Sequence, residues 1–355
     1  MKFKGDDSMS LSNRNFSMME FLKQKYREYK RPLTFNATTK EEAETWHKKM
    51  YNKLVELLGG FPSTCDLNPE IVSSEPEEGY TRYKVVFDSE PGMSVVAWLL
   101  VPDNIKPGER RPAVIALHGH NDAGKDNVTG RDYGDKARQE VIEHANYDYG
   151  KQFALRGYVV IAQDHRRWNE RDYGFTALRP RDPCNVLFIE SMLFGLNPLM
   201  MNVWDTMRCV DYLKTREDVD GDRIGTVGLS YGGTVSLFTA AIDPRIKAAI
   251  VSCYLTTYEA LALTLHNFCG SQAVTGLLKY AEIADAAGLI APRPALYEIG
   301  IYDKGFPIEA SRKAFAHVKQ IYKVMGVGDR VEADEFPEGH KFSGRKAYDF
   351  FAKWL

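Results

Sequence analysis

Residues 223–242, RIGTVGLSYGGTVSLFTAAI, decide the fold of this 355-residue chain. Residues 223–229 form a largely apolar run that predicts a buried strand, and Thr234–Ile242 has the pattern of a helix. Between them, residues 228–232 spell a G-x-S-x-G turn. A serine on a sharp strand-to-helix turn presents its hydroxyl at the carboxyl edge of a sheet, with glycines leaving room for neighbouring backbone. We therefore predict that Ser230 is a nucleophile; the alternative is an ordinary serine in a glycine-rich turn.

The pattern of short apolar runs separated by helical segments continues on both sides of this stretch. Further strands are predicted at 81–87, 93–101, 112–117, 158–162, 246–252, 295–302 and 331–336, and further helices at 150–156, 203–213, 308–325 and 343–355. Buried strands that alternate with helices indicate an α/β fold with a mostly parallel central sheet and helices on both faces. The long connections 164–200 and 254–290 indicate loops that shape a site.

The first 72 residues have a different character. Residues 1–14 are charged and lack an apolar run, so we expect them to be disordered and not to form a secretory signal. Farther on, Trp46, Met50 and Leu54 recur at four-residue steps and place one apolar face on a helix. The sequence therefore predicts a helical N-terminal extension at 15–72 and a catalytic domain at 73–355.

The composition excludes several classes of function. Lysine and arginine total 46 against 48 aspartate and glutamate, so no basic excess favours nucleic acid or an anionic membrane as partner. No run of about 18 apolar residues predicts a membrane span. The five cysteines are odd in number and form no CxxC pair, which argues against a disulfide framework or a zinc site. We expect a cytoplasmic protein without a bound metal.

A serine nucleophile needs a base and an acid, and in folds of this type both follow the serine in the chain. Among the histidines after Ser230, His340 is placed in a loop just past the last predicted strand, whereas His317 is inside a predicted helix. Asp303 directly follows the strand at 295–302, where a carboxylate can orient an imidazole. We predict His340 as base and Asp303 as acid, with Glu298 as the alternative acid.

The oxyanion of an acyl-transfer reaction needs fixed hydrogen-bond donors. One should be the backbone N–H of Tyr231, which follows the nucleophile. The other should come from the loop after the strand at 112–117, and we favour the amide of His120. A metal site formed by His118 and His120 is the competing interpretation, but no further ligand is spaced nearby in the sequence.

Several longer motifs make the sequence resemble a known superfamily. They are ALHGHNDAGKD (116–126), VWDTMRCVDYLKTREDVDGDRIGTVGLSYGG (203–233), HNFCG (266–270), LIAPRPALYEIGIYDKGFP (289–307) and FPEGHKF (336–342). From about Tyr80 to Leu355 the chain resembles the α/β-hydrolase superfamily, in particular its dienelactone-hydrolase and acetyl xylan esterase-like branch. The resemblance implies Ser230, Asp303 and His340 as a triad that cleaves small carboxylic esters, often acetyl esters of sugars, without a cofactor. Dienelactone hydrolases proper use cysteine where this chain has Ser230.

Two other functions remain open from the sequence. A serine peptidase of the prolyl-oligopeptidase kind shares this catalytic core, although such proteins usually carry a large β-propeller before it. A binding protein on a catalytically dead hydrolase fold is the third possibility, although such proteins typically lose a triad residue. His266 and Trp168 lie in the long connections and are candidates for the substrate pocket; a purely structural role is the alternative for each. The oligomeric state is left open.

Overall fold

The central element of the computed structural model, which describes residues 14–174 and 181–355, is a sheet of nine strands. Their order across the sheet is β1-β2-β3-β5-β4-β6-β7-β8-β9, antiparallel from β1 through β3 to β5 and parallel from β5 to β9. The strands are β1 (Glu70–Glu77), β2 (Tyr80–Glu90), β3 (Met93–Pro102), β4 (Arg111–Leu117), β5 (Val159–Gln163), β6 (Val219–Leu229), β7 (Ile246–Ser252), β8 (Ala295–Gly300) and β9 (Val331–Phe336).

Helices cover both faces of this sheet, as predicted. Along β4, Ala113, Ile115 and Leu117 point into one hydrophobic cluster and Val114 and Ala116 into the other, because successive side chains of a strand alternate between faces. The first cluster is covered by α7 (Pro198–Lys214), α8 (Tyr231–Ile242), α10 (Ile283–Gly288) and α11 (Ile308–Val324). The second is covered by α4 (Lys136–Ala145), α5 (Tyr149–Ala154) and α12 (Ala347–Trp354).

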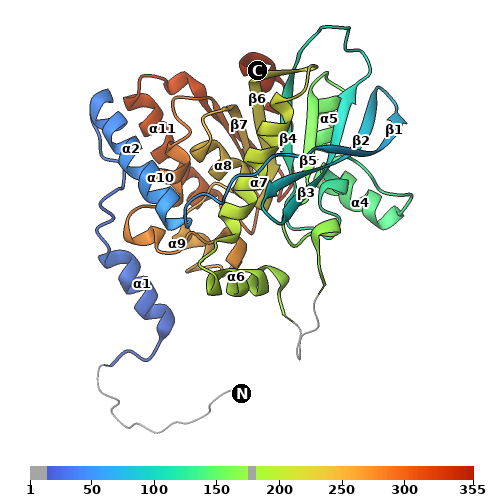
Figure 1. Cartoon of the computed structure of the whole chain (residues 1–355). Helices are drawn as coiled ribbons and strands as arrows, with labels where there is room; N and C mark the ends of the chain where they lie inside the picture. The colour runs from blue at the N-terminus through green and yellow to red at the C-terminus, as the bar shows by residue number, and fades with distance from the viewer. Residues whose placement is uncertain (1–13, 175–180) are drawn as a thin grey trace.

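The N-terminal segment contributes two helices and one strand. Helix α2 (Lys40–Leu57) begins at a capping box formed by Thr39 and Glu42, and it buries Trp46, Met50 and Leu54 against the outer side of α10 and α11 (Figure 1). Helix α1 (Met18–Glu28) buries no residue. Residues 1–13, for which the sequence predicts disorder, lie outside the described residues.

Strand β1 was not predicted, and the boundary drawn between residues 72 and 73 falls inside it. Its sequence, EIVSSEPE, has no buried residue and pairs only with β2 at the edge of the sheet. An edge strand that faces solvent needs no apolar alternation, so the pattern that revealed the other strands is missing.

The remaining helices lie in the connections at the carboxyl edge of the parallel strands. They are α3 (Lys125–Val128), α6 (Pro183–Leu193) and α9 (Tyr258–Leu261); α6 and α9 fall in the two long connections singled out by the sequence (Figure 1). Within the described residues no single helix is both long and apolar enough to span a membrane, and α6 and α7 pass that test only as a pair bent by 93°.

Candidate active site

Ser230 lies on the turn between β6 and α8, at the position predicted from the G-x-S-x-G pattern. Its φ of 62° and ψ of −120° fall in a region that a non-glycine residue adopts rarely. The turn is fixed on both sides, because Ser230 N–H donates to the Ser252 carbonyl of β7 (2.9 Å) and its own carbonyl accepts from Thr234 N–H (3.0 Å). The serine is thus held at the carboxyl edge of the sheet and at the start of a helix.

The flanking glycines are required by close backbone contacts. A Cβ atom on Gly228 would lie 2.2 Å from the Gly232 carbonyl group, and one on Gly232 would lie 1.9 Å from the Leu117 oxygen. A Cβ on Gly119 would lie 3.1 Å from Cβ of Ser230. The turn therefore packs directly against the loop that follows β4, where the second oxyanion donor is predicted.

Asp303 and His340 are brought together across the ends of β8 and β9. His340 Nδ1 lies 2.6 Å from Asp303 Oδ2, and the imidazole stacks on Phe306 with ring centroids 5.5 Å apart. The other carboxylate oxygen, Oδ1, accepts from the N–H groups of Gly305 (2.8 Å) and Phe306 (3.2 Å). Because a carboxylate accepts only, Nδ1 carries the hydrogen and Nε2 is left to accept a proton from a nucleophile.

Glu298, the alternative acid, has a different environment. It is buried within β8, and its carboxyl oxygens accept from Ser343 N–H (3.1 Å) and Gly344 N–H (2.9 Å). Burial raises the pKa of this carboxyl to about 7. Glu298 therefore anchors the loop just beyond His340.

The raised pKa of Glu298 predicts a pH-dependent stability. The folded state holds this proton up to about pH 7, whereas a free glutamate loses it near about 4.3. The unfolded chain therefore binds fewer protons in this window, and the contribution of Glu298 to stability falls as pH rises from about 4.5 to 7, by about 3 kcal/mol. We expect Glu298→Gln, which does not titrate, to gain stability relative to the wild type between pH 5 and pH 8 in urea unfolding.

The control for this experiment is Glu338→Gln, which changes an exposed loop glutamate close to the same histidine. A stability difference between Glu298→Gln and the wild type that is the same at both pH values would contradict a protonated, buried Glu298.

The predicted oxyanion donors lie at the start of α8 and in the loop after β4. Tyr231 is the first residue of α8, so its N–H belongs to the first turn, where backbone donors have no partner within the helix. Its side chain is fully buried, accepts from Asn202 Nδ2 (2.9 Å) and stacks on Trp168. His120 is exposed and its ring lies 5.0 Å from that of Tyr231.

His118 supports this loop through both of its ring nitrogens. Its Nε2 accepts from His165 N–H (2.9 Å), and its Nδ1 lies 2.8 Å from the Gly119 carbonyl. Both ring nitrogens are therefore occupied by backbone groups, and burial lowers the pKa of His118 to about 3. Tyr147 makes a further hydrogen bond to this loop, because its hydroxyl accepts from Gly119 N–H (2.7 Å). The sequence offered no signal for the roles of His165 and Tyr147, which depend on contacts between distant segments.

A cavity of about 730 Å³ joins the predicted residues. Ser230, Asp303, His340, His120 and His266 all line it. Trp168 lines a neighbouring cavity of about 1000 Å³, which shares His120 and Asp182 with the first. His266 also bonds within its own loop, since Nδ1 lies 3.1 Å from the Ala262 carbonyl. The structure thus places His266 at the pocket of Ser230 and Trp168 next to it.

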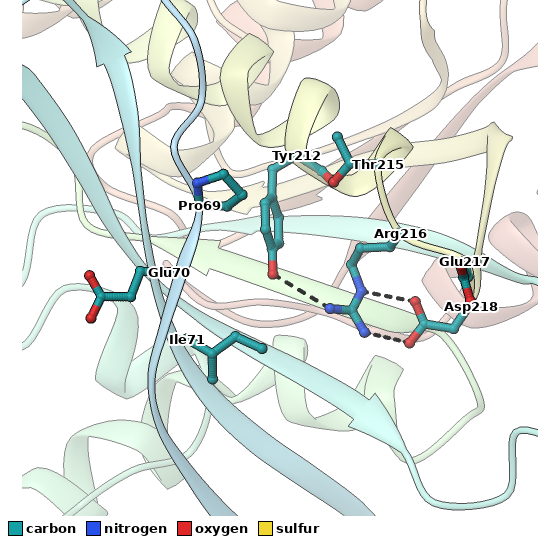
Figure 2. Close-up of a pocket in the computed structure, with 8 residues that line it drawn as sticks. All are labelled: Pro69, Glu70, Ile71, Tyr212, Thr215, Arg216, Glu217 and Asp218. Carbon is teal, nitrogen blue, oxygen red and sulfur yellow. Dashed lines mark hydrogen bonds and ion pairs between the residues drawn. The ribbon is translucent and has the colours of Figure 1, made fainter.

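Another cavity lies between β1 and the end of α7 (Figure 2). Asp218 in its wall immediately precedes β6, so this cavity is at the amino end of that strand, whereas Ser230 follows its carboxyl end. Arg216 is its central cation, and its guanidinium already donates to both Asp218 oxygens and to the Tyr212 hydroxyl. No serine, cysteine or histidine lines this cavity, so the candidate active site is the pocket of Ser230.

Solved structures share the whole architecture. A Bacteroides fragilis protein described as a putative acetyl xylan esterase superposes with a TM-score of 0.73 at 20% identity, covering 92% of this chain and 84% of its own. A glucuronoyl esterase from Solibacter usitatus superposes with a TM-score of 0.62 at 15% identity, covering 87% of this chain and 92% of its own. At such identities the likeness establishes the fold.

Sequence comparison extends the likeness to the N-terminal segment. The Bacillus subtilis protein named "Putative hydrolase YtaP" is 29% identical over 314 residues, which cover 85% of this chain and 98% of that protein. The Abhydrolase family matches residues 4–349, and so includes the helical segment that the motif resemblance had left outside. The chain belongs to the Abhydrolase family, within the α/β-hydrolase superfamily.

Proposed function

We propose that this protein is a serine esterase that hydrolyses small carboxylic esters, including acetyl esters of carbohydrates, through an acyl-enzyme on Ser230. The observation that carries the proposal is the convergence of Ser230 with the hydrogen-bonded pair Asp303–His340 on one cavity. A nucleophile, a base and an orienting carboxylate in one pocket are the groups that ester cleavage requires. The fold shared with esterases supports the same reaction class.

These groups support the following reaction. Ser230 Oγ attacks the ester carbonyl carbon while His340 Nε2 takes its proton, and Asp303 stabilises the imidazolium that forms. The N–H groups of Tyr231 and His120 donate to the oxyanion. Collapse of this intermediate breaks the bond to the alcohol, which leaves with the proton from His340. Water, activated by the same imidazole, then releases the acid and restores Ser230.

The walls of the pocket support a hydrophilic alcohol group. Polar and charged side chains reach the cavity from the connections around it, and hydroxyl-rich substrates can hydrogen-bond to such groups. They are Asp182, Asn185, Asn267, Gln272 and Lys304. Phe268 and Phe306 add apolar surface, of the kind that packs against the face of a sugar ring.

A chain-length series of p-nitrophenyl esters tests this proposal. We expect kcat/KM for the acetate to exceed that for the octanoate by about tenfold or more, because the polar and charged side chains in the pocket wall leave a long acyl chain few apolar partners. Acetylated sugars should also be deacetylated, and Ser230→Ala gives the background rate. Faster cleavage of prolyl or aminoacyl anilides than of acetate esters would favour a peptidase instead.

A further inference from the structure

Three potential metal-ligand atoms lie close together in residues that line the two cavities. His120 Nε2, Cys184 Sγ and Cys269 Sγ all lie within 4.8 Å of one another, and His120 Nε2 lies 3.2 Å from Cys269 Sγ. They come from three separate segments: the loop after β4, the first turn of α6, and the connection that follows α9. Nothing in the Ser230 mechanism uses either sulfur.

Cys184 and Cys269 are free cysteines whose sulfur atoms lie close to each other and to the imidazole of His120. Thiolate sulfur and imidazole nitrogen are ligands that zinc prefers in proteins, and a thiol releases its proton when the metal ion binds.

The spacing of these atoms fits a tetrahedral ion. Zinc binds thiolate sulfur at about 2.3 Å and imidazole nitrogen at about 2.0–2.1 Å. At tetrahedral angles, these bond lengths put donor atoms roughly 3.5–3.8 Å apart. The separations found here need only small side-chain shifts to reach that arrangement. Cys269 lines the cavity of Ser230, Cys184 lines the neighbouring cavity and His120 lines both, so an ion can reach the cluster.

The segments that carry the sulfurs are already fastened to each other. Gly270 N–H donates to Asn185 Oδ1 (2.9 Å), which joins the residue after Cys269 to the residue after Cys184. Gly270 also packs against Phe188 of α6 so closely that a Cβ atom would lie 2.2 Å from it. The two sulfurs are thus held near each other by contacts that do not involve them, which lowers the ordering cost of binding an ion.

We propose that His120, Cys184 and Cys269 bind a thiophilic divalent cation such as Zn²⁺, whose fourth tetrahedral position is taken by water. The ion would cross-link the loop of the predicted oxyanion donor with α6 and with the connection after α9. The ion would be bound by the side chain of His120, whereas the ester chemistry uses the backbone N–H of that residue, so the existence of the metal site does not depend on the proposed function.

Metal content of the purified chain tests the proposal. Reduced protein is incubated with Zn²⁺ and desalted, and we expect one equivalent to remain bound. Cys184→Ser and Cys269→Ser should each weaken binding by about 100-fold or more, since changes outside the ligand set already cost 10–100-fold. Cys65→Ser removes a thiol far from the cluster in the sequence and should retain the equivalent. Titration with Cd²⁺ should give thiolate-to-metal charge-transfer absorption that both cluster variants lack.

Zn²⁺ binding by Ser230→Ala separates this proposal from the esterase hypothesis. The variant should bind one equivalent of Zn²⁺ although it lacks the nucleophile, because metal content is measured without any hydrolysis. Equal Zn²⁺ content in the wild type and in Cys269→Ser would overturn the site. So would a reduced wild-type protein that binds no Zn²⁺ but forms a Cys184–Cys269 disulfide in air.

Discussion

Replacing Ser230 by alanine is expected to lower ester hydrolysis by about three to six orders of magnitude, because nucleophile, base and acid act as a unit. The fold should survive, since the hydrogen bonds that fix the turn at Ser230 are made by its backbone N–H and carbonyl. Removing the hydroxyl leaves them in place. Hydrolysis of p-nitrophenyl acetate by the two proteins measures the loss.

The site of covalent reaction provides the matching control. A fluorophosphonate probe should label the wild type on the peptide that contains Ser230 and should leave Ser230→Ala unlabelled. Circular dichroism and the melting temperature should agree for the two proteins. Activity of Ser230→Ala near the wild-type level would end the hypothesis of a serine nucleophile.

Replacing Asp303 by asparagine is the second large effect expected. The amide can donate to Nδ1, which would favour the tautomer that carries its hydrogen on Nε2 and is unable to accept the serine proton. A loss of about 10⁴ in kcat is the magnitude known for such a change in a serine hydrolase triad. His340→Ala should lose activity on a similar scale. Steady-state kinetics on p-nitrophenyl acetate measure both.

Glu298→Gln is the control that distinguishes the two candidate acids. Glutamine keeps an oxygen for only one of the two N–H groups of Ser343 and Gly344, but it leaves the Asp303–His340 hydrogen bond in place, so we expect kcat to change by less than about tenfold. An inactive Glu298→Gln beside an active Asp303→Asn would reverse the assignment. The assignment would then require the loop of His340 to move.

The fold was predictable from the sequence where strands are buried and helices follow them. Residues 223–242 combine an apolar strand, a glycine-rich turn and a buried helix, and each of the three is recognisable from the apolar and glycine pattern of its own residues. Asp303 and His340 could be predicted as a pair because both follow strands that end at the same edge of the sheet. Their 2.6 Å contact agrees with that expectation, and their role in catalysis stays a prediction.

Other features depend on contacts between distant segments and left no local pattern. Strand β1 has no buried residue and therefore no alternating apolar pattern. Cys184 and Cys269 are 85 residues apart in the printed sequence, and no spacing rule links them. The hydrogen bonds of His165 and Tyr147 to the loop after β4 join segments that only the folded sheet brings together. The sequence thus predicted groups at strand ends, and the structure was needed for the loops around them.

The docking of α2 has a consequence for how this chain folds during synthesis. His47 of α2 bonds to the Leu289 carbonyl, a partner 242 residues later in the chain. At ribosomal rates of about 5–20 residues per second, the helix waits roughly 10 to 50 seconds for its partner to be made. Through that time Trp46 has its local partners Leu33 and Phe35, but the stripe of Trp46, Met50 and Leu54 lacks the surface that α10 and α11 provide. Helix α2 is therefore among the first elements translated and among the last to dock on the rest of the fold.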